Sequence, residues 1–181
     1  KLAMGGLYLL LLSGLSACDA AARNAAFESG NYEGLLLAVS SDGQLTGRFE
    51  ERAGLDGRIT CSYALKGTAN GSKASANIND GAGHLGVVSL AWTDKVIAFR
   101  LEGGGKFKCA PALGEWGSEW TLEQVQKLNW VEIRRIRSDR AYFHDAPTAA
   151  KVRRAFVVKN DVVGVVKSDG AWLSIEYLGD R

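Results

Sequence analysis

Cysteine and histidine are the residues of this sequence whose number and spacing could indicate a metal site or a catalytic site. The 181-residue chain has three cysteines, Cys18, Cys61 and Cys109, and two histidines, His84 and His144. A zinc site takes three or four Cys, His or carboxylate ligands at motif spacing, which these residues do not have. No Gly-x-Ser-x-Gly segment supplies a serine nucleophile to work with His144. We therefore expect no metal, no cofactor and no catalytic residue, and hence a protein that is not an enzyme.

The first cysteine follows a short apolar run. Residues 7–12 are large and apolar, and Lys1 precedes them. This run is too short to span a bilayer, which takes about 20 residues, but it has the length of a signal-peptide core. Leu15-Ser16-Ala17-Cys18 resembles the lipobox of bacterial lipoproteins. The resemblance implies that residues 1–17 are cleaved off, that the Cys18 thiol is diacylated, and that the protein is lipid-anchored to the cell membrane, facing the periplasm.

The other two cysteines are expected to form a disulfide, because an exported protein meets an oxidising compartment. Cys61 and Cys109 each lie in a segment of alternating apolar residues, over 58–67 and 106–113, which points both thiols toward one core. In the chain-entropy model such a bridge contributes about 4 kcal/mol. Two separate buried thiols are the alternative.

Residues 32–115 have the pattern of an all-β domain. The chain contains 22 glycines and 2 prolines, and its apolar runs are short. Hairpin turns are expected at Ser41-Asp42-Gly43, at Asn70-Gly71 and at Thr93-Asp94. About seven strands result, which predicts an antiparallel barrel or sandwich.

A short helix is expected over 116–129, as a joint between two domains. Thr121 and Gln124 resemble a capping box, and Leu122, Val125 and Leu128 fall at helical spacing. The chain as a whole is therefore expected to be mainly β. Its expected parts are a signal peptide over 1–17, a tether over 18–31, a disulfide-bearing β domain over 32–115, the helical linker over 116–129 and a second β domain over 130–181.

Residues 140–178 resemble the bacterial SH3-like (SH3b) domain. The matching segments are RAYFHDAP and AFVVKNDVVGVVKSDGAWLSIEY, with the turn Lys159-Asn160-Asp161 and the strand containing Trp172 and Ile175. The resemblance implies a small β barrel whose aromatic groove binds cell-wall peptide or a protein segment. The family continues to a Gly-Trp-Ile strand that is absent here, so an open edge is expected.

Four aromatic residues are the candidates for that groove: Tyr142, Phe143, Trp172 and Tyr177. Strand alternation in RAYFHDAP places Tyr142 and His144 on one face and Phe143 on the other. Phe143 is then the better core residue, and Tyr142 lies outward. Trp172 could equally belong to the core. Trp116, Trp120 and Trp130 surround the expected joint, where they either pack the two domains together or take part in recognition.

Positive charge is concentrated in the second domain. Residues 127–181 contain 11 basic and 7 acidic side chains, against 10 basic and 13 acidic in 19–126. Nucleic acid is set aside for a periplasmic lipoprotein. The basic face is then either simply solvated, or it meets anionic lipid headgroups or an acidic partner.

These observations predict a lipid-anchored cell-envelope binding protein. Its SH3-like domain would bind a peptidoglycan peptide or an envelope protein. The alternative is an envelope inhibitor or immunity protein that blocks a wall-degrading enzyme.

Overall fold

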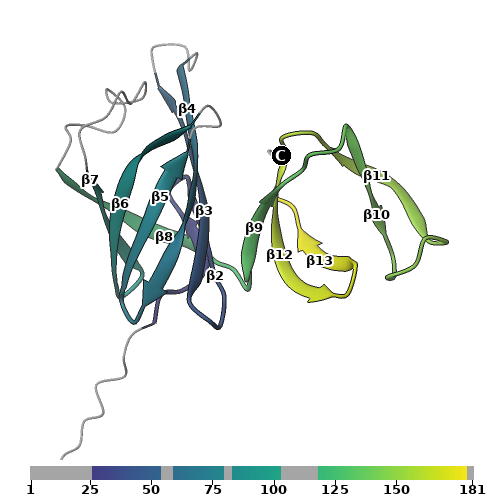
Figure 1. Ribbon diagram of the computed structural model, residues 1–181, viewed down its shortest axis with the longest axis horizontal. Helices are drawn as coiled ribbons and strands as arrows, with labels where there is room; N and C mark the ends of the chain where they lie inside the picture. Colours follow the sequence, from purple (N-terminus) through teal and green to yellow (C-terminus); the bar gives the residue numbers. More distant parts are fainter. Residues whose placement is uncertain (1–25, 54–58, 80–82, 103–117, 179–181) are drawn as a thin grey trace, which may run out of the picture.

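The computed structural model describes residues 26–53, 59–79, 83–102 and 118–178, and all the regular structure in these ranges is β-strand. The strands form two units that lie beside one another, a barrel and a smaller unit that contains the C-terminal strands (Figure 1). The expectation of a mainly β protein is confirmed, and the first unit is a barrel and not a sandwich. No helix of the described residues is long and apolar enough to cross a membrane.

The barrel has eight antiparallel strands, each paired with the next along the chain, and the last pairs with the first to close it. The strands are β1 (Gly30–Tyr32), β2 (Leu35–Val39), β3 (Gln44–Ala53), β4 (Ile59–Asn70), β5 (Lys73–Asn79), β6 (His84–Thr93), β7 (Val96–Glu102) and β8 (Glu119–Lys127).

The three expected hairpin turns are confirmed. Gly43 and Gly71 have φ of +79° and +60°, which glycine adopts without the steric penalty of a side chain. Asp94 and Lys95 join β6 to β7 with φ of +47° and +71°. Two successive positive φ values are the signature of a type I′ turn, whose twist matches that of the strands it joins.

The barrel is filled by its own side chains. In β5 and β7 the buried residues alternate with exposed or half-buried ones, as period-2 strands require. The rings of Phe49 and Tyr63 stack with centroids 4.9 Å apart, and Phe99 lies beside Phe49 at 6.4 Å. Burying each such large apolar side chain contributes about 1.5–3 kcal/mol. The barrel interior is therefore a core rather than a ligand cavity.

The expected helix over 116–129 is wrong, because its described part contains strand β8. Trp120 and Leu122 are half-buried and pair with Phe99 and Ile97 of β7. Val125, which the helical spacing had counted as apolar-facing, is 67% exposed. Pairing with β7 on one edge and β1 on the other bonds the backbone on both sides, which outweighs the weak local helical signal.

Polar side chains reinforce the seam where β8 meets β1. The Gln124 amide donates to the Tyr32 hydroxyl at 3.1 Å, and that hydroxyl donates to the Glu28 carbonyl at 2.8 Å. Burial raises the pKa of Tyr32 to about 12, so the phenol stays protonated and can donate.

The second unit follows directly after β8. Strands β13, β12 and β9 form one three-stranded sheet, and β10 and β11 form a separate two-stranded ribbon. In Figure 1 the three-stranded sheet lies next to the barrel and the ribbon lies at the far end of the molecule. The bounds are β9 (Glu132–Arg135), β10 (Arg140–His144), β11 (Val152–Val158), β12 (Val162–Asp169) and β13 (Trp172–Glu176).

An apolar junction joins the two units. Strand β9 contacts the outside of β2 and β3. Ser29 accepts a hydrogen bond from the Val39 amide and donates one to the Trp130 carbonyl, at 2.9 and 2.7 Å. The Ile133 amide donates to the Thr46 hydroxyl at 2.8 Å. The junction consists of Ala38, Leu128 and Trp130, with Leu36, Ile133 and Val166 packed against them.

Trp130 is the centre of this junction. A Cβ on Gly164 of β12 would lie 2.0 Å from the indole ring, so only glycine permits this contact. The indole Nε1 donates to Glu176 of β13 at 2.7 Å. Of the three tryptophans expected at the joint, Trp130 lies there, Trp120 stacks on Phe99 in the barrel, and Trp116 is outside the described residues.

Candidate functional site

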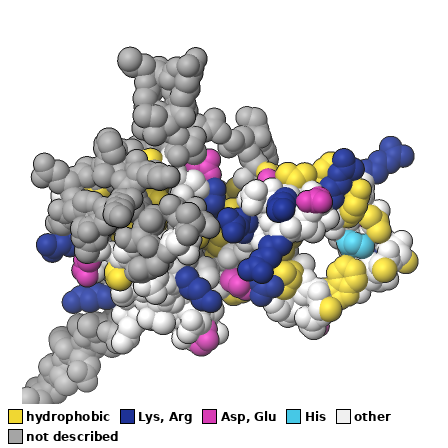
Figure 2. Space-filling model, turned by 45° about the horizontal axis from the view of Figure 1, so that its top comes forward, with side chains coloured by type: hydrophobic (Ala, Val, Ile, Leu, Met, Phe, Trp, Pro, Cys, Tyr) yellow, Lys and Arg dark blue, Asp and Glu magenta, His cyan; other side chains and the backbone are white. Residues whose placement is uncertain are grey.

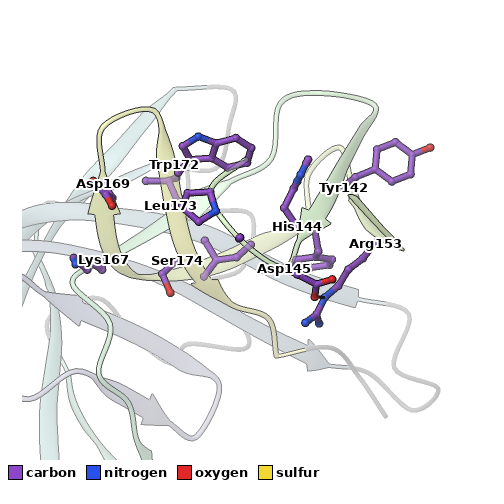
Figure 3. Close-up of a pocket in the computed structure, with 13 residues that line it drawn as sticks. Tyr142, His144, Asp145, Arg153, Lys167, Asp169, Trp172, Leu173 and Ser174 are labelled. Atoms are coloured by element: carbon purple, nitrogen blue, oxygen red, sulfur yellow. Dashed lines mark hydrogen bonds and ion pairs between the residues drawn. The ribbon is translucent and has the colours of Figure 1, made fainter. Parts of the chain in front are cut away.

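A cleft of about 510 Å³ opens between the ribbon and the three-stranded sheet of the second unit. Its walls come from the end of β10, the loop after it, the end of β12 and strand β13 (Figure 3). The lining residues are Tyr142, Phe143, His144, Asp145, Ala146, Pro147, Arg153, Lys167, Asp169, Trp172, Leu173, Ser174 and Ile175.

An aromatic contact connects the two sides of the cleft. The rings of His144 on β10 and Trp172 on β13 meet edge-on, with centroids 4.9 Å apart. The His144 Nδ1 lies 3.0 Å from the Thr148 carbonyl, and since a carbonyl can only accept, Nδ1 carries the proton.

Charged side chains lie at two sides of this aromatic centre. Arg153 Nε donates to Asp145 on one side, and Lys167 and Asp169 lie on the other (Figure 3). The Arg153 and Asp145 side chains are 60% and 54% exposed, so this pair adds little stability and is open to exchange with a ligand. The cleft thus has apolar and aromatic walls with charges at its margins, the composition typical of ligand sites.

Three of the four predicted binding residues line the cleft, namely Tyr142, Phe143 and Trp172, and Tyr177 does not. Tyr142 is at the margin: it is 47% exposed, its ring points away from the other labelled residues in Figure 3, and it packs on Phe156 at 5.7 Å. Tyr177 follows β13 and is 46% exposed.

Tyr142 and His144, which alternation places on one face of β10, make different contacts. Tyr142 packs on Phe156, and His144 contacts Trp172. A bulge in β11 separates their strand partners, because Tyr142 pairs with Phe156 and His144 with Val152. Strand alternation alone could not have predicted the bulge.

The charged lining residues were not predicted as a site. Arg153 and Lys167 appeared in the sequence only as members of a basic stretch. His144 and Asp145 are adjacent in the sequence, and this adjacency was the one local signal that polar groups gather here. The cleft brings them to Trp172, which is 28 residues further along the chain than His144.

The lining does not have the geometry of a catalytic triad. Ser174 and His144 both line the cleft, but Asp145 is bonded to Arg153, and His144 donates its orienting hydrogen bond to a backbone carbonyl and not to a carboxylate. In a catalytic triad the carboxylate is hydrogen-bonded to the histidine, and the histidine is hydrogen-bonded to the nucleophile. No group of three His, Cys, Asp or Glu side chains in the described ranges could hold a metal ion. The arrangement suits a ligand that has an apolar or planar group for the aromatic walls. Positively and negatively charged groups on the same ligand could form hydrogen bonds at the margins.

Two of the predicted modification sites lie outside the described residues. Cys18 belongs to residues 1–25 and Cys109 to residues 103–117. Cys61 is buried on β4, on the barrel-facing side that it shares with Tyr63 and Leu65. Its inward position is as the sequence predicted, and its pairing with Cys109 remains a prediction.

Comparison of the chain with protein-family models, with curated proteins and with solved structures found no significant match.

Proposed function

We propose that this protein is a cell-envelope binding protein, anchored to the membrane through an acylated Cys18, whose second unit binds an extended peptide. The observation that carries the proposal is the cleft between the ribbon and strand β13, with Trp172, His144 and Phe143 in its walls. Exposed aromatic rings in a concave site supply much of the binding energy in peptide recognition.

The second unit also fits the proposed relation to SH3-like domains. Its five short strands, the turn at Asn160 with φ of +78°, and the position of Trp172 at the start of β13 agree with the segments on which that resemblance rests. We therefore propose cell-wall peptide or a segment of an envelope protein as the ligand class.

Binding to purified sacculi tests the proposal. Trp172→Ala should weaken retention about thirtyfold, because truncating a central aromatic anchor typically costs about 2 kcal/mol or more. Phe156→Ala is the matched control, since Phe156 is a half-exposed aromatic of the same unit that does not line the cleft. If both variants bind as well as the wild type while melting at the same temperature, the cleft is not the site.

The anchor is tested separately. Cys18→Ser should release the expressed protein from the membrane fraction. If the variant is processed normally and still fractionates with membranes, the lipoprotein hypothesis is wrong.

A second candidate function is inhibition of a wall-degrading enzyme. The observation that favours it is a set of cations in the second unit that form no ion pair with another described residue: Arg135, Arg137, Lys151, Arg154, Lys159 and Lys167. Such a surface would raise the rate of association with an acidic active-site cleft. Loss of lysozyme-like activity on mixing with the protein, without retention on sacculi, would favour this function over the first.

A further inference from the structure

The face of the β10–β11 ribbon that Tyr142 shares with Phe156 is apolar and exposed. Arg140 pairs directly with Val158 and Tyr142 with Phe156, and directly opposed residues of antiparallel strands project from the same face. We call these four residues the ribbon face. Tyr142, Phe156 and Val158 are 47%, 42% and 41% exposed, and Val152, further along β11, is 55% exposed. Figure 2 shows hydrophobic side chains gathered on this end of the second unit, with Lys and Arg among them.

Positive charge accompanies this apolar surface at both ends of β11. Lys159 follows Val158, Lys151 precedes Val152, and Arg154 lies two residues after Val152 in the sequence. The segment containing Arg137 lies beside the turn that contains Lys159, because the Asn160 amide donates to the Ile136 carbonyl at 2.9 Å. None of these four cations forms an ion pair with another residue that the structure describes.

Arg140 lies within the face itself. Its guanidinium is 4.8 Å from the centre of the Phe156 ring, which keeps the charge at the surface beside an aromatic group. The neighbouring carboxylates are Asp139, Asp145 and Asp161. Asp145 is paired with Arg153, and Asp161 accepts a hydrogen bond from the Val158 amide. Cations therefore outnumber acidic groups around the ribbon face.

We propose that the ribbon face docks on a surface of anionic lipid headgroups. Aromatic and aliphatic side chains enter the boundary between headgroups and acyl chains, while Arg and Lys extend to the phosphates. Because these cations lie at opposite ends of β11, a partner that pairs with all of them must present negative groups along the length of the ribbon. A lipid surface presents such groups and needs no pocket on the protein. Tyr142 belongs to both surfaces, but Phe156, Val158, Arg154 and Lys159 do not line the cleft, so docking can be tested separately from peptide binding through these residues.

Vesicle binding tests the proposal. The full chain carrying Cys18→Ser, which removes any acyl contribution, is mixed with vesicles of phosphatidylcholine alone or with an equal part of phosphatidylglycerol. Binding should be stronger to the anionic vesicles. It should also weaken as salt shortens the screening length from about 10 Å at 0.1 M to about 3 Å at 1 M. Equal binding to both vesicles would overturn the proposal.

Two charge-matched variants then locate the surface. Arg154→Gln with Lys159→Gln should lower partitioning onto anionic vesicles about thirtyfold, since each cation near the surface contributes about 1 kcal/mol. Lys66→Gln with Lys73→Gln removes the same charge from exposed positions on the barrel and should change partitioning less than threefold. A loss as large in the barrel variant would mean that net charge alone governs binding, and the proposal fails.

Phe156→Ser tests the apolar part, and polyglutamate tests the alternative occupant. The serine variant should lower vesicle partitioning about fivefold, since the exposed half of the ring no longer leaves water. Its retention on sacculi should not change, which separates this surface from the cleft. If polyglutamate binds as tightly as the anionic vesicles and loses affinity in the same variants, the face recognises an acidic chain and the lipid proposal is overturned.

Discussion

The barrel and the second unit differ in what they do with their apolar side chains. The barrel closes, so the edges of its described strands are paired, and sixteen buried residues of the described ranges form one continuous core. The second unit consists of two sheets that do not close on one another along their described strands. Of the eight large hydrophobic side chains that are exposed in the described ranges, only Val125 belongs to the barrel.

This difference separates stability from recognition. Packed side chains inside a closed barrel gain burial but offer little to a ligand. The second unit leaves apolar and aromatic groups exposed and therefore buries less apolar surface, but these groups form surfaces that a partner can cover. The second unit is supported by the barrel through the Trp130 junction, so it need not supply all the burial energy that a small unit would otherwise require.

The largest difference in stability between the two units should come from replacing one phenylalanine in each of them. Phe99→Ala removes a ring that is 1% exposed and should lower the free energy of unfolding by about 4 kcal/mol, through lost burial and the cavity that remains. Phe156→Ala, at 42% exposed, should cost less than about 1 kcal/mol. Urea denaturation measures both. Equal losses would mean that the ribbon carries as much packing energy as the barrel.

The proposed disulfide would add to the advantage of the barrel. If Cys61 and Cys109 are bridged, reduction should lower the free energy of unfolding by up to about 4 kcal/mol. Mass spectrometry of a non-reduced digest should contain the two peptides joined. Full reaction of both thiols with a maleimide under denaturing, non-reducing conditions would contradict the bridge.

Gly164→Ala tests the support that the junction gives. The added Cβ would meet the Trp130 ring at 2.0 Å, and displacing the ring should cost about 2 kcal/mol. Gly83→Ala is the control, because its Cβ would have no atom within 4 Å. A cost as large for Gly83→Ala would show that the effect comes from the backbone and not from the indole.

Glu176→Gln should have the smallest effect. The glutamine oxygen can still accept from the Trp130 Nε1, but it loses the charge that strengthens the 2.7 Å hydrogen bond, so about 1 kcal/mol is expected. A double-mutant cycle with Trp130→Phe isolates the interaction. A coupling energy of zero would show that this hydrogen bond does not stabilise the junction.

Local signals were enough to predict the hairpins and the β class. Gly43, Gly71 and Asp94 adopt positive φ because the turn geometry demands it, and this demand is satisfied within a few residues. Alternation in β5 and β7 likewise follows from the two-residue period of a strand. The aromatic residues Phe143 and Trp172 were selected from the proposed resemblance of residues 140–178 to SH3-like domains, and both line the cleft.

Long-range contacts decided the rest. The segment over 119–127 has a helical spacing, and only its pairing with β7 and β1 makes it a strand. The contacts of His144 with Trp172 and of Tyr142 with Phe156, and the bulge of β11 between their strand partners, follow from no alternation rule. Gly164 reads as an ordinary strand glycine until Trp130 is found against it. The sequence by itself determined the turns and the periodicity of strands such as β5 and β7, because those depend on neighbours along the chain. Closure of the barrel, the junction and the charged margins of the cleft depend on residues far apart in sequence, so only the tertiary structure decided them.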